Sequence, residues 1–341
     1  MNPVLDFGIQ MIIFLQGLGD WLTGAMQFFS FLGNEEFFLL IMPILYWCVD
    51  SGIGMRVGLI LIISNSLNAI LKIIFHGPRP FFYDGRVRAL TTETSFGIPS
   101  GHAQNSAAVW GLLAIHAGGG WWVVGAIILV FLIGLSRLYL GVHFPTDVLL
   151  GWLAGALLVW GFIRLEAPVK AIFARQKLSS QLFSVFLVSL VPILLAFLAR
   201  LALGAWTIPE AWIATTALTN PGGEPPDPLA FSGIITNAGV IFGLAAGVFL
   251  LAAAGGFDSR GVWWKRLLRF PIGLVGVVLF YFGLGTIFPG GEGMFPFFLR
   301  YIRYALVGLW IAYLAPMVFI WLGLAQPSVL PTQIAREPAI R

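Results

Sequence analysis

Apolar stretches long enough to cross a lipid bilayer recur along almost the whole chain, and short segments rich in charged residues, glycine or proline separate them. About 20 consecutive apolar residues suffice for a membrane-spanning helix. The pattern therefore predicts an all-α, polytopic integral membrane protein. We expect about ten spans, near 9–31, 36–50, 55–76, 101–118, 121–138, 146–164, 180–203, 230–254, 270–288 and 304–325.

The first two predicted spans have the weakest signals. Asp20 interrupts the first and the second is short, so either could be re-entrant. No lysine or arginine precedes Arg56, so the basic region that opens a cleavable signal peptide is missing. We expect the first apolar segment to remain in the mature protein.

Composition excludes several other classes of protein. A single cysteine, Cys48, forbids an intrachain disulfide and cannot form a zinc cluster alone. The formal charge is +4, but the basic residues sit in short loops between apolar segments and form no extended face for nucleic acid. We expect membrane lipids rather than nucleic acid as partners, and the sequence predicts no oligomeric state.

The apolar pattern gives way to a basic segment near residues 164–180. We interpret 1–166 as a catalytic transmembrane core of six helices, because it holds every motif described below. Residues 167–179 are a predicted cytoplasmic linker, and 180–341 a C-terminal region of about four more spans with no assigned role. In both parts a Gly-x3-Gly pattern could let helices approach closely, at 151–155 and 243–247.

Loop charge predicts the orientation. Counting the predicted spans places all three motifs at one face of the membrane. The connections on the other face carry most of the basic residues that belong to no motif: Arg164, Lys170, Arg175, Lys177, Arg260, Lys265, Arg266 and Arg269. The 204–229 connection on the motif face carries only acidic charge: Glu210, Glu224 and Asp227. By the positive-inside rule, the motif face is then the extracytoplasmic face and both termini lie in the cytoplasm. We expect the membrane to be the plasma (inner) membrane.

The first motif pairs Lys72 with Arg79, seven positions apart. Gly77 and Pro78 should break the helix between them, which lets Arg79 fold back toward Lys72. Lysine offers a point charge and arginine a planar fork that suits two phosphate oxygens. The alternative is a lysine that snorkels to the interface and an arginine that is only a loop charge.

The second motif, Pro99-Ser100-Gly101-His102, precedes an apolar helix. Ser100 is the expected N-cap, and free amides beside Gly101 would attract an anion. His102 could give a proton to a departing oxygen, as a general acid does. An ordinary helix start with an interfacial histidine is the alternative.

The third motif runs from Ser136-Arg137 to His143 and Asp147. Pro145 favours the first turn of the next helix, where Asp147 suits the helix dipole and can reach back to His143. A carboxylate on one imidazole nitrogen would leave the other free to attack. A simple Asp cap beside an uninvolved histidine is the alternative.

Other polar and aromatic residues near the motifs receive plainer interpretations. We expect Phe81, Phe82 and Tyr83 to lie at the membrane interface. The loop between the first two motifs holds charges that could select head groups, although solvated loop charges are the favoured interpretation: Asp84, Arg86, Arg88 and Glu93.

Together, K-x6-RP, PSGH and SR-x5-H-x3-D resemble the three signatures of the type 2 phosphatidic acid phosphatase superfamily, over roughly residues 35–166. The resemblance implies a six-span helical core that hydrolyses phosphomonoesters or diphosphates, with no required metal and no cofactor. It implies that His143 is the nucleophile, Asp147 its orienting partner and His102 the acid. The residues that it implies for binding phosphoryl oxygens are Lys72, Arg79, Ser100, Gly101 and Arg137.

The expected function is therefore a membrane phosphatase that forms a phosphohistidine on an amphiphilic lipid phosphate. Phosphatidic acid, phosphatidylglycerol phosphate and polyprenyl diphosphates such as undecaprenyl diphosphate all remain open as substrates. A lipid-phosphate phosphotransferase with the same site is one alternative. A lipid transporter or scramblase is another, because intramembrane charges also mark transport paths.

Overall fold

The computed structural model describes residues 2–219, 222 and 224–328. Within them the chain forms helices and turns, with one isolated β-bridge (Asp258 to Gln326) and no strand, which confirms the all-α prediction. The helices of the first half are α1 (Pro3–Gly17), η1 (Asp20–Leu22), α2 (Thr23–Phe31), α3 (Glu35–Ile44), η2 (Leu45–Val49), α4 (Ser51–Phe75), α5 (Pro80–Tyr83), α6 (Gly101–Ala117), α7 (Gly120–Tyr139) and α8 (Pro145–Ala174).

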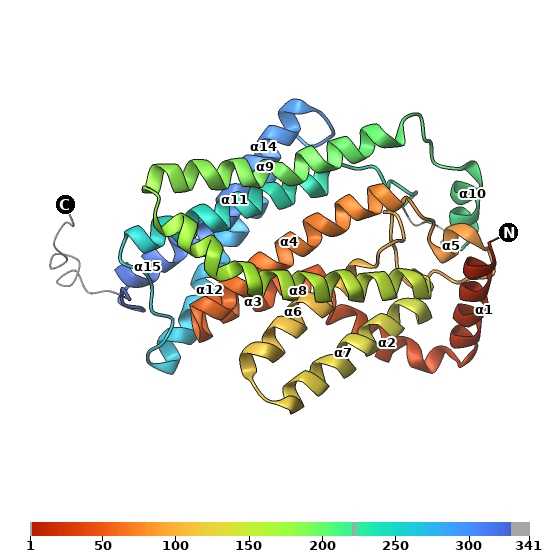
Figure 1. The fold of residues 1–341 in the computed structure, drawn as a ribbon, viewed down its shortest axis with the longest axis horizontal. Coiled ribbons are helices and arrows are strands. Elements are labelled where there is room, and N and C mark those ends of the chain that lie inside the picture. The colour runs from red at the N-terminus through yellow and green to blue at the C-terminus, as the bar shows by residue number, and fades with distance from the viewer. Residues whose placement is uncertain (1, 220–221, 223, 329–341) are drawn as a thin grey trace. The chain divides into compact units, whose positions relative to one another are not determined.

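Figure 1 follows the chain from red at the N-terminus to blue at the end of the described part. The helices of the second half are α9 (Leu178–Leu203), α10 (Glu210–Thr219), α11 (Ser232–Ala253), α12 (Trp263–Val278), η3 (Leu279–Gly283), α13 (Leu284–Ile287), α14 (Met294–Leu309), η4 (Trp310–Leu314) and α15 (Ala315–Trp321).

Seven helical segments of the described chain are long and apolar enough to cross a membrane, or up to eight if a bent pair is one span. They fall where seven of the ten predicted spans fall: Ser51–Tyr83, Gly120–Tyr139, Pro145–Ala174, Leu178–Leu203, Ser232–Ala253, Trp263–Ile287 and Met294–Trp321. The predicted total of ten, and its division into six and four, are not confirmed.

Two of the remaining predicted spans, 9–31 and 36–50, are broken or bent, and the third, 101–118, is the continuous but shorter helix α6. The predicted span 9–31 is divided into α1, η1 and α2, and Gly19 and Asp20 stand at the break. Residues 20–31 and 35–49 together form a pair bent by 48°. α6 has only 17 residues. A buried carboxylate is costly in hydrocarbon, and Asp20 here is exposed and pairs with Arg88 instead.

The chain divides into two compact units, and each draws on separate stretches of sequence. Unit 1 comprises Met1–Phe38, Ser64–Arg164 and Leu194–Ala230, and it holds all three motifs. Unit 2 comprises Leu39–Ile63, Leu165–Ile193 and Phe231–Arg341.

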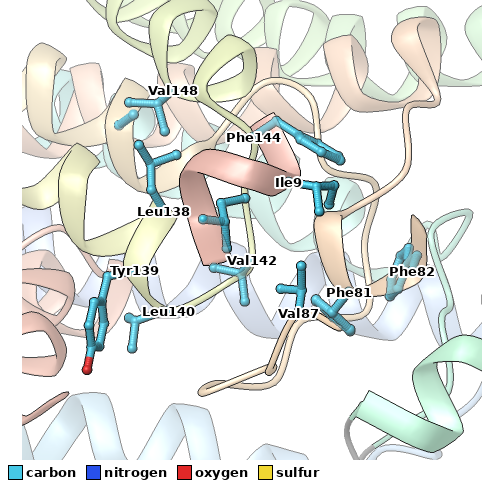
Figure 2. Packing of buried hydrophobic residues seen from close by; sticks show 12 residues of the cluster. Ile9, Phe81, Phe82, Val87, Leu138, Tyr139, Leu140, Val142, Phe144 and Val148 are labelled. Carbon is cyan, nitrogen blue, oxygen red and sulfur yellow. The ribbon is translucent and has the colours of Figure 1, made fainter. Parts of the chain in front are cut away.

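The core of unit 1 lies next to the third motif. Side chains of α1, α5, the end of α7, the start of α8 and the segment between α7 and α8 belong to a buried cluster. The residues of it that are labelled in Figure 2 are Ile9, Phe81, Phe82, Val87, Leu138, Tyr139, Leu140, Val142, Phe144 and Val148. Phe81 and Phe82 are 0% and 1% exposed. Their position at the membrane interface stays a prediction, but both rings belong to the buried cluster and Phe82 stacks on Trp212.

The glycine pair at 151–155 serves contact within the chain. A side chain at Gly151 would meet the backbone oxygen of Ser100 at 2.6 Å, and one at Gly155 would meet that of Gln104 at 2.5 Å. These glycines let α8 lie directly against the start of α6. The contact fixes where the second motif sits relative to the third.

Gly155→Ala is expected to lower the stability of the protein. The added methyl group must push the α6 backbone away, and overpacking of this kind costs about 1–3 kcal/mol. Thermal unfolding in detergent would measure the loss. Gly161→Ala on the same helix is the control, since nothing lies within 4 Å of its new methyl group. Equal behaviour of the two variants would contradict the packing argument.

Unit 2 is organised around α11 and α14. Gly243 lies so close to α14 that a side chain there would meet the backbone oxygen of Ala305 at 2.1 Å. Arg269 of α12 is 1% exposed and donates only to backbone carbonyls, those of Trp47, Ser259, Arg260 and Leu324. It therefore ties four chain segments of this unit together.

Candidate active site

The first motif brings its two cations to one point. α4 ends at Phe75 and α5 begins at Pro80, so the helix breaks where Gly77 and Pro78 predict. Lys72 Nζ donates to Ser95 Oγ at 2.7 Å, and Arg79 Nη2 donates to the same oxygen at 3.0 Å. Arg79 is fully buried. The predicted approach of the two cations is therefore confirmed.

The second motif starts α6 as predicted. Ser100 is the N-cap, and its Oγ accepts from Ala103 N at 3.4 Å. Because that oxygen accepts there, its own proton is left for another acceptor. Gly101 lies against Asn68, whose Oδ1 would be 3.2 Å from an added side chain. The half-buried His102 ring has no hydrogen-bond partner within the described ranges.

The third motif supplies a histidine held by a carboxylate. His143 Nδ1 lies 3.3 Å from Asp147 Oδ2, which confirms the predicted reach across the start of α8. Asp147 Oδ2 also accepts from Phe144 N at 2.9 Å, and both side chains are buried. If Nδ1 donates to Asp147, Nε2 carries the lone pair and accepts from Arg79 Nη1 at 3.2 Å.

The second and third motifs are joined through the backbone. Ser100 N donates to the carbonyl of Asp147 at 2.9 Å. Gly97, just before the second motif, would place a side chain 2.4 Å from Pro78 O and 3.2 Å from Asp147 Oδ2. All three motifs therefore meet in unit 1, and a glycine at 97 is required for the close approach.

Arg137 brings a third cation from the end of α7. Its side chain is 2% exposed, Nη1 donates to Ser30 of α2, and Nη2 pairs with Glu93. Its Nε has no partner among the described residues. A buried donor without a partner is costly, so this nitrogen suits a ligand oxygen. Ser136 turns away, because its hydroxyl donates to Ile133 O at 2.6 Å.

Glu93 is one of the residues at this site that the sequence interpretation did not place there. Its Oε2 accepts from Arg79 Nη2 at 3.0 Å and its Oε1 from Arg137, and its side chain is 22% exposed. The favoured interpretation of Glu93 as a solvated loop charge is therefore wrong. The same interpretation fits Arg86, which is 71% exposed and pairs with its neighbour Asp84.

The electrostatics follow from burial and three nearby cations. Burial disfavours a charged Glu93, but Arg79, Arg137 and Lys72 outweigh burial and hold the pKa of this carboxyl below its ordinary value. Burial and the same cations lower the pKa of His143 well below its ordinary value. The Glu93 carboxylate is therefore ionised at neutral pH, and the imidazole of His143 is neutral.

A buried polar network positions the second motif. Asn68 Nδ2 donates to Pro99 O at 3.2 Å and to Gln104 Oε1 at 3.0 Å, and Gln104 Nε2 donates to Ser64 O at 2.8 Å. Ser64 and Asn68 lie one helical turn apart on α4. That spacing of polar residues within an apolar helix is the signal that could have revealed the network.

Comparison with known proteins shows the family of this chain. The family model of the PAP2 superfamily matches residues 53–171, and that of the PAP2 superfamily phosphatase transmembrane extension matches residues 235–327. Phosphatidylglycerophosphatase B of Bacillus subtilis is 33% identical over 153 residues, which are 40% of this chain and 72% of that protein. The chain belongs to the PAP2 superfamily. The predicted resemblance is confirmed, and this chain is an integral, multi-pass membrane protein of that superfamily.

Other relatives within the superfamily carry different names. Glucose-6-phosphatase 3 of Bos taurus is 31% identical, over 47% of this chain and 53% of that protein. Undecaprenyl-diphosphatase of Sulfolobus acidocaldarius is 30% identical, over 44% of this chain and 75% of that protein. This PAP2 chain thus spans about half the length of the first of these relatives.

A solved structure is also similar. The crystal structure of a transmembrane PAP2 type phosphatidylglycerolphosphate phosphatase from Bacillus subtilis shares 27% identity and a TM-score of 0.42, and the match covers 49% of this chain and 89% of that one. In the described part of the PAP2 chain, no group of three or more histidine, cysteine, aspartate or glutamate side chains is placed to hold a metal ion.

Proposed function

We propose that this chain is a phosphatase that hydrolyses a lipid phosphate or polyprenyl diphosphate through a phosphohistidine at the extracytoplasmic face. The observation that carries the proposal is the His143 imidazole, oriented by Asp147 at 3.3 Å with its second nitrogen beside Arg79. A neutral, oriented imidazole next to two buried guanidinium groups is suited to attack phosphorus.

The first half-reaction forms the phosphoenzyme. His143 Nε2 attacks phosphorus, a nitrogen–phosphorus bond forms, and the bond from phosphorus to the leaving oxygen breaks. His102 gives its proton to that oxygen. Asp147 stabilises the charge that develops on the His143 ring. The phosphoryl oxygens would be held by Lys72, Arg79, Ser100, Gly101 and Arg137.

The second half-reaction returns the enzyme to its starting state. His102, now neutral, takes a proton from water as the water oxygen attacks phosphorus. The nitrogen–phosphorus bond of His143 breaks and inorganic phosphate leaves. Each proton and electron pair is accounted for by these two histidines and one water molecule.

The substrate class is argued from the membrane setting. A head group can enter a site at the bilayer boundary while its hydrocarbon tail stays in lipid. The names of the relatives point to a lipid phosphate, a polyprenyl diphosphate and a sugar phosphate. The deciding experiment is phosphate release in detergent from phosphatidylglycerol phosphate, phosphatidic acid, undecaprenyl diphosphate and glucose 6-phosphate, with and without a chelator.

The outcomes of that experiment are distinct. We expect release from an amphiphilic substrate with no effect of the chelator. Release only from glucose 6-phosphate would contradict the lipid assignment, and loss of activity with the chelator would contradict a metal-independent mechanism. Radiolabel that passes to an added alcohol acceptor instead of to water would identify a phosphotransferase.

We propose three parts for the PAP2 chain: a catalytic core over 1–166, a basic linker over 167–179, and a C-terminal region over 180–341. The transmembrane-extension match over 235–327 falls in the third part. We further propose the plasma (inner) membrane as its location, with both termini in the cytoplasm. Residues 1 and 329–341 at those termini lie outside the described residues.

The orientation makes a labelling prediction. Arg86 is 71% exposed in the loop next to the site, and Lys177 lies in the basic segment between α8 and α9. In a Cys48→Ser background, a membrane-impermeant thiol reagent should label Arg86→Cys in intact cells and Lys177→Cys only after permeabilisation. The reverse pattern would invert the proposed topology.

A further inference from the structure

The Glu93 carboxylate occupies the groups that a phosphoryl ligand needs. One of its oxygens accepts from Arg79 Nη2 at 3.0 Å and the other from Arg137 Nη2. A phosphate binds two guanidinium groups through two of its oxygens in the same manner. Bound phosphate and Glu93 therefore compete for the same hydrogen-bond donors.

The charges at the site favour replacement of Glu93 by a bound phosphoryl group over the presence of both. Lys72, Arg79 and Arg137 surround the Glu93 carboxylate and hold it ionised. A dianionic phosphoryl group added beside Glu93 would place like charges against one another in a buried setting. If Glu93 leaves, the three cations face the dianion instead, which is the less costly arrangement.

The loop that carries Glu93 is anchored on both sides. Leu90 N donates to Leu140 O at 3.0 Å, and Gly97 N donates to Gly77 O at 3.0 Å. Thr94 O accepts from Asp227 N at 3.0 Å. Because these bonds fix the backbone, a change at Glu93 falls to its side chain.

Space for that side chain is available next to the loop. An open hollow of about 500 Å³ is lined by Thr92, Glu93, Thr94, Gly222 and Glu224. The Glu93 carboxylate can rotate into this hollow and be hydrated there. The movement would release Arg79 and Arg137 together.

We propose that Glu93 is an internal competitor of the substrate: it holds Arg79 and Arg137 in the free enzyme, leaves as a phosphoryl group binds, and returns as inorganic phosphate departs. This inference rests on the proposed phosphatase function for its role in turnover. The exchange itself concerns only anion binding. It predicts that loss of the Glu93 charge strengthens phosphate binding.

The test is the affinity of the purified full-length chain for inorganic phosphate, measured by isothermal titration calorimetry in detergent. Glu93→Gln keeps the size of the side chain and removes its charge. We expect the dissociation constant to fall by about tenfold or more, which corresponds to ~1.4 kcal/mol. An unchanged or weaker affinity would overturn the proposal.

A matched control separates competition from the general field of a negative charge. Glu224 lines the same hollow and has no ion pair with a cation in the described structure. Glu224→Gln should change phosphate affinity by less than about twofold. If both variants gain the same affinity for phosphate, the gain comes from the long-range effect of removing a negative charge. The proposal that Glu93 competes for the two arginines would then be wrong.

Turnover gives a second readout, because a positioning role predicts the opposite result. As a competitor, Glu93→Gln lowers KM and strengthens product inhibition by phosphate, without a rise in kcat. As a residue that only positions the two arginines, it would raise KM and lower kcat. Failure of both Glu93→Gln and Glu93→Ala to fold would assign a structural role and overturn the proposal.

The two proposals can fail separately. Tighter phosphate binding by Glu93→Gln, without turnover of any substrate by the wild type, would contradict the phosphatase proposal and support the competition proposal. Normal turnover by the wild type, with no gain in phosphate affinity in Glu93→Gln, would support the phosphatase proposal and contradict the competition proposal.

Discussion

His143→Ala is expected to abolish phosphate release, with a loss of about 10⁴-fold or more in kcat. The reason is that no other described side chain holds a neutral imidazole nitrogen beside Arg79, with its second nitrogen on a carboxylate. Water would have to attack phosphorus directly, without the covalent intermediate. Phosphate release from the best substrate of the panel measures the effect.

A labelling experiment tests the same prediction at the intermediate. Wild-type protein mixed briefly with ³²P-labelled substrate should carry an acid-labile, base-stable label, and His143→Ala should carry none. His116→Ala is the control, because His116 lies at the far end of α6 and its ring contacts Leu112 O. Normal turnover by His143→Ala would refute the nucleophile assignment.

Arg79→Ala has the second largest expected effect, a loss of about 10²–10³-fold in kcat/KM, which is typical when a preorganised donor to a developing anion is removed. Its guanidinium contacts Glu93, Ser95 and His143 at once, at distances of 2.7 to 3.2 Å. Removal would therefore take away a proposed phosphoryl ligand and the neighbour of the proposed nucleophile together.

Arg79→Lys separates the contribution of the planar guanidinium group from that of its positive charge. Lysine keeps the cation but cannot bind two oxygens in one plane, so we expect partial recovery and activity well below the wild type. Arg86→Ala, on the exposed part of the following loop, should change kcat/KM by less than about twofold. Full activity of Arg79→Lys would show that the fork has no part in transition-state binding.

Much of the site could be predicted because its signals are local. The N-cap at Ser100, the helix break at Gly77-Pro78 and the four-residue spacing of His143 and Asp147 each act within one or two turns. Such signals depend on neighbouring residues, so the sequence alone shows them. The same holds for the apolar length that predicts seven of the spans.

The contacts of Glu93 could not be predicted in this way. Its partners lie 14 and 44 positions away, and nothing in the adjacent sequence distinguishes it from exposed charges such as Arg86. Ser30, which accepts from Arg137, is 107 positions distant. Likewise Phe81 and Phe82 are aromatic residues of the kind found at membrane interfaces, and only their packing against α10 and α1 buries them.

The sequence by itself determined the helical membrane fold and the three motifs that resemble those of the superfamily, because apolar length and the local order of residues are visible in it. The tertiary structure alone decided that the first predicted span breaks near Asp20, that two glycines hold α8 against α6, and that Glu93 joins two arginines. The physical reason is that burial and ion pairing depend on which distant segments meet, and the local sequence does not encode that choice.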